Sequence, residues 1–182
     1  HNASAVLRSC DCFGIQDVHI IENRNAYTVN PDVALGSSRW LSLHRYNRQD
    51  DNTMQCIQAL RDKGYRIIAT TPHARDTEIG LIDLGSPIAL LFGTELNGLS
   101  DTAIQAADGY ARIPMAGFTE SFNISVSVAI CLYELSGRLR RTCEPSLWQL
   151  SGNERQALLL EWVRQSLKRA DLLEKEFLDR HG

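Results

Sequence analysis

Residues 66–70 read RIIAT, and this short apolar run indicates a buried strand. Gly64 stands just before it, and the spacing of apolar residues over 53–63 is typical of a helix that such a glycine ends. We therefore predict a helix followed closely by a strand.

The same alternation continues toward the C-terminus. IALLF at 88–92 and ARIPM at 111–115 are further candidate strands, and a helix is predicted between them at 101–107. Strands that alternate with helices are typical of parallel sheets. The predicted fold class is therefore α/β, with a mainly parallel sheet and helices on both of its faces.

Two more elements are predicted near the N-terminus. Residues 2–13 have the spacing of a short amphipathic helix that Gly14 ends, and a strand follows at 18–22. Residues 26–50 are rich in turn-forming residues, so we expect mostly loop there, with a short strand near Trp40.

Two helices are predicted in the last third of the chain. Residues 123–139 have the pattern of a helix that is largely buried against the sheet. Ser151 and Glu154 have the spacing of a capping box, and a long amphipathic C-terminal helix is expected to follow them. The expected organisation is one domain at 1–141, then a linker and terminal helix at 142–182.

Composition narrows the class of protein. The chain has 182 residues, of which 43% are hydrophobic and 23% charged, enough for one substantial core. It has no apolar run long enough to cross a membrane and no charged leader, which favours a cytoplasmic protein without a membrane partner. The net charge is −3, so any contact with nucleic acid must use a local basic patch.

The five cysteines form an odd set, and only two of them are close in sequence, on one predicted helix. Buried thiols are therefore favoured over disulfides or a zinc site, and no metal is expected. The cysteines are Cys10, Cys12, Cys56, Cys131 and Cys143.

Three loops leave the carboxyl ends of predicted strands, at 70–72, 93–98 and 115–123. Ligands of parallel sheets bind at that edge, so one pocket is expected to gather all three loops. The loop at 93–98 has neither a dinucleotide-binding glycine pattern nor a phosphate-binding P-loop. Nicotinamide and P-loop nucleotide sites are therefore not supported.

Three segments resemble the motifs of the SpoU/TrmH family, in the SPOUT class of methyltransferases, and occur in the family's order. They are HNASAVLRS at the N-terminus, FGTELNGLS at 92–100 and RIPMAGFTESFNISVSVAICLYEL at 112–135. The third motif departs from the usual Ser-Leu-Asn-Val-Ser-Val-Ala by reading Ser-Phe-Asn-Ile-Ser-Val-Ser, which keeps the polar positions and alters the pocket near Phe122.

The resemblance implies a homodimeric enzyme that transfers methyl from S-adenosylmethionine to a ribose 2′-hydroxyl of RNA, leaving S-adenosylhomocysteine. It also implies a deep C-terminal trefoil knot that holds the cofactor. Family members have a strand before the first motif, so an N-terminal strand is expected to be missing from this sequence, along with part of target selection.

The same resemblance implies roles for individual residues. Catalytic roles fall on Arg8, Asn2, Glu95, Ser121 and Asn123. The S-adenosylmethionine pocket would be lined by Thr70, Gly93, Ile113 and Phe122.

Methyl transfer needs a group that relieves the ribose hydroxyl of its proton, and the motifs contain neither histidine, beyond the first residue, nor aspartate. Arg8 is the family's presumed base, but a guanidinium keeps its proton far above neutral pH, so deprotonating it there costs roughly 8 kcal/mol. We therefore hypothesise that Arg8 binds the neighbouring phosphate and stabilises alkoxide charge, while a phosphate oxygen or water takes the proton. His73 is better interpreted as a loop-surface residue.

Basic residues at the end of the predicted helix are candidates for RNA binding. They are Arg138, Arg140 and Arg141, with Arg39, Arg45 and Arg48 as lesser candidates. Cations at a helix C-terminus also favour the helix dipole, so a purely structural role stays open for the cluster.

The preferred substrate is a guanosine in the D-loop of tRNA, because a compact chain with a C-terminal helical extension resembles the tRNA-directed branch of the family. Ribosomal RNA is the alternative in the same class. An inactive RNA-binding or dimerisation module of the same fold, and a nucleotide-binding α/β enzyme of other chemistry, are alternatives from other classes.

Overall fold

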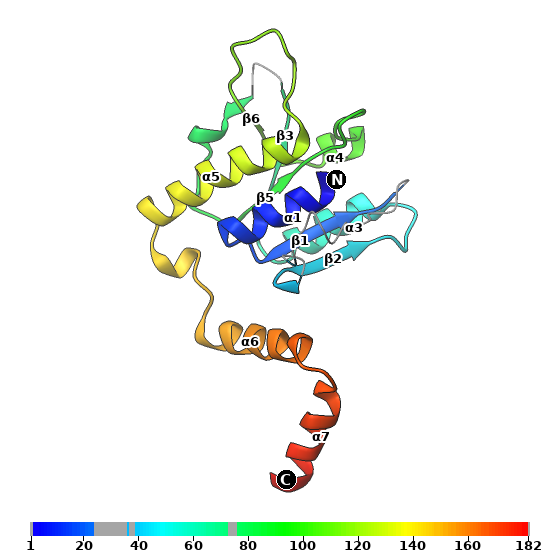
Figure 1. The fold of residues 1–182 in the computed structure, drawn as a ribbon. Coiled ribbons are helices and arrows are strands. Elements are labelled where there is room, and N and C mark those ends of the chain that lie inside the picture. Colours follow the sequence, from blue (N-terminus) through cyan, green and yellow to red (C-terminus); the bar gives the residue numbers. More distant parts are fainter. Residues whose placement is uncertain (1, 24–35, 37–38, 73–75, 182) are drawn as a thin grey trace. The chain divides into compact units, whose positions relative to one another are not determined.

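The computed structural model describes residues 2–23, 36, 39–72 and 76–181 (Figure 1). The chain forms two compact units, His1–Leu147 and Trp148–Gly182. In the described part of the chain, no helix is both long and apolar enough to cross a membrane.

The strands that the structure describes in the first unit, β1 to β6, all pair in parallel. One sheet has the order β4 (Thr77–Glu78), β6 (Gly109–Arg112), β3 (Arg66–Thr70) and β5 (Ile88–Leu91). The other pairs β1 (Asp17–Ile21) with β2 (Ser42–Tyr46), the strand expected near Trp40. The predicted α/β class with a parallel sheet is therefore confirmed.

The described residues of this unit form the α-helices α1 (Asn2–Phe13), α3 (Asn52–Arg61), α4 (Asp101–Gln105) and α5 (Ile124–Thr142). Gly14 and Gly64 follow α1 and α3 with positive φ angles of 73° and 82°, a conformation that glycine adopts freely. Among the described residues of this unit, Ile79–Leu81 and Pro145–Leu147 form the short 3-10 helices η2 and η3.

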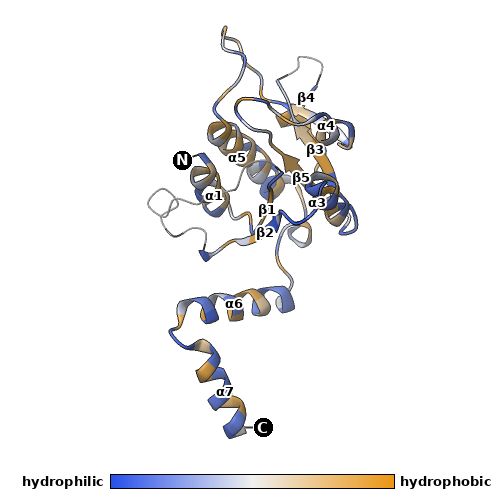
Figure 2. Cartoon of the chain, turned by 90° about the vertical axis from the view of Figure 1, so that its right-hand side faces the viewer, coloured by the Kyte–Doolittle hydropathy of each residue, from blue (hydrophilic) through white to orange (hydrophobic). Residues whose placement is uncertain are grey.

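The central strand β3 places helices on both faces of the sheet, because successive side chains of a strand point to opposite sides. Ile67 packs in a cluster with Ile57 and Leu60 of α3. Its neighbour Ile68 packs with Cys131 and Leu135 of α5. Figure 2 shows hydrophobic residues concentrated on β3 and β5, as this two-sided burial requires.

Helices α1 and α5 lie side by side and run in the same direction (Figure 1). Leu7 of α1 is fully buried against Val128 and Leu132 of α5. At the C-terminal ends, Arg140 donates a hydrogen bond to the carbonyl of Phe13 at 2.7 Å. This packing brings the start of α1, where Asn2 lies, to the start of α5, where Asn123 lies.

The second unit contains α6 (Gly152–Ser166) and α7 (Ala170–His181). The capping box of Ser151 and Glu154 is present at the start of α6. The prediction of one long terminal helix is wrong, because Leu167 is extended and Arg169 adopts a left-handed φ of 63°. An ion pair between Arg164 and Glu174 links the two helices.

Candidate functional site

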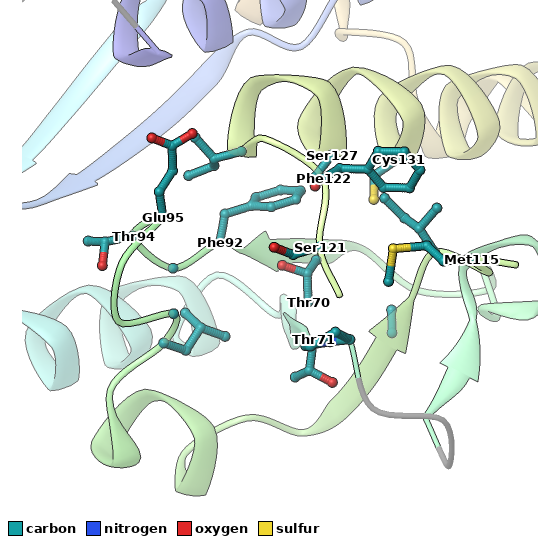
Figure 3. A pocket seen from close by; sticks show the side chains of 17 residues that line it. Thr70, Thr71, Phe92, Thr94, Glu95, Met115, Ser121, Phe122, Ser127 and Cys131 are labelled. Atoms are coloured by element: carbon teal, nitrogen blue, oxygen red, sulfur yellow. The ribbon is translucent and has the colours of Figure 1, made fainter. Parts of the chain in front are cut away.

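A cavity of about 280 Å³ lies at the carboxyl ends of the central strands (Figure 3). The three loops that the sequence placed at this edge all contribute to its wall. In Figure 3, Glu95 and Met115 lie on opposite sides of the cavity, with Phe92 and Ser121 between them. The predicted common pocket is therefore present, near the lower end of the roughly 300–1,000 Å³ typical of ligand sites.

The loop after β5 is folded back on itself. Thr94 and Gly98 exchange two backbone hydrogen bonds of 2.9 Å, and Gly98 has a φ of 64°. A Cβ atom on Gly93 would lie 2.1 Å from the carbonyl carbon of Gly98. Glycine at 93 therefore permits a backbone approach that displays Glu95 at the turn.

Asn123 joins two other candidate residues, Asn2 and Glu95, in one hydrogen-bonded cluster. As the N-cap of α5, its side-chain oxygen accepts from the Ser125 backbone N–H at 2.9 Å. Its amide nitrogen donates to Asn2 at 3.1 Å and also to Glu95. The first, second and third motifs therefore meet beside the cavity.

Arg8 does not join this cluster. It lies on α1 six residues after Asn2, about 9 Å farther along the helix axis. Its side chain is exposed, it does not line the cavity, and it makes no hydrogen bond or ion pair with another described residue. Within one chain, Arg8 therefore stands apart from the other catalytic candidates.

The remaining candidates of the pocket line the cavity. Thr70, Gly93, Ile113 and Phe122 form part of its wall together with Ser121. The hydroxyl of Thr70 donates to the carbonyl of Leu91 at 2.9 Å, which ties the ends of β3 and β5 together. The wall is thus held by the sheet at one side and by the two loops at the other.

The basic cluster lies at the far end of α5. Arg141 lies fourteen positions after Ser127 of the cavity wall, about 21 Å along the helix. Arg138 donates to the carbonyls of Ile79 and Ile82, and Arg140 donates to Phe13. These two arginines have structural roles, and Arg141 is exposed.

The lesser basic candidates differ in their surroundings. Arg45 forms an ion pair with Glu22 at 3.4 Å, and Arg39 and Arg48 are exposed. His73 lies outside the described residues.

Charge makes the cavity suitable for a cation. Its wall includes one carboxylate, that of Glu95, and no lysine, arginine or histidine among the described residues. Phe92, Phe122 and Met115 add apolar and aromatic surface suited to a flat heterocycle. A ligand with a sulfonium cation and an adenine ring, such as S-adenosylmethionine, fits this combination.

Several wall residues were missed by the sequence reasoning. Thr71 and Met115 belong to loops that were already expected at this edge, so their places in those loops were the available signal. Ser127 and Cys131 follow Asn123 at intervals of four residues, which places them on one face of α5. Helical spacing from Asn123 was therefore the signal that would have found them.

Fold and site define a parallel-sheet α/β protein with a ligand cavity at the carboxyl edge of its strands. The model of the SpoU methylase family, described as the SpoU rRNA Methylase family, matches residues 1–133. The chain belongs to this family.

Similar proteins extend the match over nearly the whole chain. A tRNA (guanosine(18)-2'-O)-methyltransferase of Borreliella burgdorferi is 42% identical over 173 residues, covering 95% of this chain and 77% of the relative. An enzyme of the same name in Thermus thermophilus is 30% identical over 168 residues, covering 91% of this chain and 83% of the relative.

Solved structures agree with this assignment. The TrmH/SpoU tRNA modifying enzyme of A. aeolicus is 28% identical, with a TM-score of 0.79 over 93% of this chain and 84% of that one. The SpoU methyltransferase AviRb from Streptomyces viridochromogenes, in complex with the cofactor AdoMet, is 27% identical, with a TM-score of 0.65 over 75% of this chain and 55% of that one.

Proposed function

We propose that this protein transfers a methyl group from S-adenosylmethionine to the 2′-oxygen of a guanosine in the D-loop of tRNA. The observation that carries the proposal is the cluster of Asn2, Glu95 and Asn123 at the edge of a cavity without cationic side chains among its described wall residues. The names of the relatives in Borreliella and Thermus support tRNA and guanosine 18 as the target. A tRNA substrate accords with a cytoplasmic location.

Bound S-adenosylmethionine would supply an electrophilic methyl group. Thr70, Gly93, Ile113 and Phe122 would hold the cofactor, because they line the cavity at the strand ends. The chain's task is then to align the ribose hydroxyl with that methyl and to remove its proton.

The polar cluster would position the ribose. Asn123 is held in place by its bonds to Asn2, Glu95 and the start of α5, so its amide does not have to be ordered during the reaction. Ser121, two residues earlier on the cavity wall, would offer a hydroxyl to the nucleotide. The neutral amide of Asn123 and the hydroxyl of Ser121 orient the substrate and do not act as the base.

Arg8 would bind the RNA phosphate next to the target and stabilise the developing alkoxide, with a phosphate oxygen or water as the proton acceptor. We expect Arg8→Ala to lower kcat by about 10²- to 10³-fold. Near-normal turnover by Arg8→Lys would contradict a need for the planar, two-pronged guanidinium. A pH–rate profile of the two variants separates this role from that of a general base.

We further propose that the protein is a homodimer and that the C-terminal part of its sheet forms a deep trefoil knot. The exposed Arg8, separated from its own cluster, supports a site that a second protomer completes. Mixing Arg8→Ala chains with Asn123→Ala chains tests this: a complete site in mixed dimers restores activity, and no restoration contradicts shared sites.

The division of labour along the chain is also a proposal. Residues 1–141 would form the catalytic domain, and 142–182 the linker and helical appendage. Arg141, with Arg138 and Arg140 beside it, would contact RNA bound at the other protomer's cavity, since the cluster is remote from its own.

Transfer of labelled methyl to tRNA and to ribosomal RNA, with the modified nucleoside mapped, tests the function. We expect 2′-O-methylguanosine in the tRNA D-loop that disappears with Arg8→Ala. Labelling of ribosomal RNA alone would move the target to the alternative that the family's name suggests. Cofactor binding without transfer to either RNA would favour an inactive module.

A further inference from the structure

The loop between β6 and α5 carries an aromatic side chain that nothing in the described chain covers. Figure 1 shows this loop projecting from the body of the first unit. All residues from 116 to 123 are exposed, and Phe118 is exposed over its whole surface, at 108% of the reference value. A phenylalanine at that degree of exposure leaves a large apolar surface in water.

A second exposed apolar side chain occupies the loop after β5. Leu96 is 95% exposed at the turn that the Thr94–Gly98 bonds create. It directly follows Glu95, which lines the cavity. The two most exposed large hydrophobic residues of the chain's described part therefore lie on the two loops that border one cavity.

Phe118 is close enough to the cavity to touch a bound substrate. It lies three residues after Met115 and three before Ser121, and both of these line the cavity. Three residues span at most about 10 Å of extended chain. The ring of Phe118 is therefore attached within about 10 Å of chain to the cavity wall on both sides.

Methyl transfer to a ribose creates a need for such a surface. A 2′-hydroxyl inside a folded tRNA reaches a cavity only when its nucleotide is splayed from the stack, which leaves the base without stacking partners. Proteins compensate by stacking the base on an aromatic side chain.

We infer that Phe118 forms the platform that receives the nucleobase of the target nucleotide. The inference rests on the proposed function and adds a residue that positions the substrate. Since every base has a π-face, the platform would strengthen binding of the target nucleotide and contribute little to the choice of base.

The surroundings of the two side chains favour a base over a second copy of the chain. Phe118 is followed by Thr119 and Glu120, and Leu96 stands between Glu95 and Asn97, all of them exposed. Cores of protein interfaces are contiguous and depleted of charged residues. Single apolar groups set among polar ones fit one flat ring better than they fit an apolar interface.

The experiment uses the full chain and a tRNA transcript that carries 2-aminopurine at the methylated position, whose fluorescence reports stacking. We expect Phe118→Ala to raise the KM for unlabelled tRNA roughly tenfold, within the range of about 5- to 150-fold that aromatic stacking provides. The affinity for S-adenosylmethionine stays unchanged. The 2-aminopurine signal should be brighter in the Phe118→Ala complex than in the wild type, because the splayed base loses its partner.

Two variants serve as controls. Phe118→Trp keeps a ring and should retain the low KM and the quenched signal. Leu81→Ala removes another strongly exposed apolar side chain, 72% exposed, from η2, which a hydrogen bond from Arg138 joins to the far end of α5. This variant should change neither readout.

A KM within twofold of wild type for Phe118→Ala would overturn the inference, as would a signal equal to that of the wild type. A change in oligomeric state of Phe118→Ala, seen by light scattering, would assign the ring to a contact between chains and would also overturn it. Absence of methyl transfer to tRNA by the wild type would refute the proposed function itself, which distinguishes the two failures.

Discussion

Asn123 performs two tasks with one side chain. Its oxygen caps α5, and its nitrogen holds Asn2 and Glu95. Because the two tasks use different atoms, substitutions can separate helix stability from the geometry of the site.

We predict that Asn123→Ser retains stability and loses activity. Serine is as good an N-cap as asparagine, so the free energy of unfolding should change by less than about 0.5 kcal/mol. The lost amide donor should lower kcat/KM at least about tenfold. Thermal unfolding and methyl transfer are measured on the same preparation.

Asn123→Ala is the matched variant, since it removes the cap as well and should cost about 1 kcal/mol of stability. Equal stability losses in the serine and alanine variants would contradict the separation of the two tasks.

Gly93 is the residue on which the shape of the second loop depends. We predict that Gly93→Ala abolishes binding of S-adenosylmethionine, because its Cβ would lie 2.1 Å from the backbone of Gly98 and the loop must open. Calorimetric titration with the cofactor measures this directly.

Gly117→Ala is the control for Gly93→Ala, since a Cβ at position 117 meets nothing within 4 Å. Normal cofactor affinity in the Gly93→Ala variant would show that the close approach of the two glycines is not needed for binding.

Strands β1 and β2 carry a stacked pair of histidines. The rings of His19 and His44 lie 4.5 Å apart, His19 contacts the Tyr46 hydroxyl at 3.0 Å, and His44 contacts Asp17 at 2.8 Å. Burial, with help from the charges of His44 and Lys63 and against that of Asp17, lowers the pKa of His19 from 6.5 to about 4. The folded protein therefore resists protonation at His19.

We predict that stability falls as the pH drops from about 6.5 toward about 4. In that window the unfolded chain binds a proton at position 19 and the folded chain does not, so lowering the pH favours unfolding. Thermal unfolding of wild type and His19→Gln at pH 7.5 and pH 5 measures the effect. The difference in melting temperature between pH 7.5 and pH 5 should be smaller in the variant than in the wild type. An unchanged difference would assign the pH dependence to other groups.

At the scale of elements, sequence patterns located the helices and strands well where local signals were strong. RIIAT at 66–70 matches β3 residue for residue. Strand β6 was expected at 111–115 but spans Gly109–Arg112, because pairing with β3 begins at Gly109. A glycine signals no strand by itself, yet a Cβ there would lie 3.2 Å from Ile68.

The break between α6 and α7 had no local signal. No glycine or proline stands at 167–170, and apolar residues continue at helical spacing through the break. The left-handed Arg169 is a conformation that the residue type does not predict. The polarity pattern therefore predicted that this segment is helical and amphipathic, but it did not predict that the helix is broken into α6 and α7.

At the scale of the whole molecule, the three hydrophobic clusters that the described residues form lie within residues 6–143. We predict that ending the chain after Leu147 leaves the first unit folded. Its melting temperature should lie within about 4 °C of that of the full chain, because a loss of less than about 1 kcal/mol in the free energy of unfolding shifts the melting temperature by no more than this. Cofactor affinity should also persist, since the cavity wall spans residues 70–131. Unfolding of the shortened chain, seen by circular dichroism, would contradict this.

The candidate site was predictable in part, for a physical reason. The pocket follows from the parallel sheet, since strand ends and their loops are local features. The meeting of Asn2 with Asn123 depends on the packing of α1 against α5, which no local pattern encodes. The separation of Arg8 from the cluster, and the hydrogen bonds of Arg138 and Arg140 to backbone carbonyls, likewise depend on tertiary packing and could not be predicted from local patterns.

The hydrogen bond between Asn2 and Asn123 has a consequence for how the protein folds during its synthesis on the ribosome. The two residues are separated by 121 positions, and the helix that Asn123 caps is also the partner that buries Leu7. Helix α1 must therefore wait, with its apolar face uncovered, until most of the first unit has left the exit tunnel. A nascent chain shorter than this cannot form the hydrogen-bonded cluster of Asn2, Glu95 and Asn123.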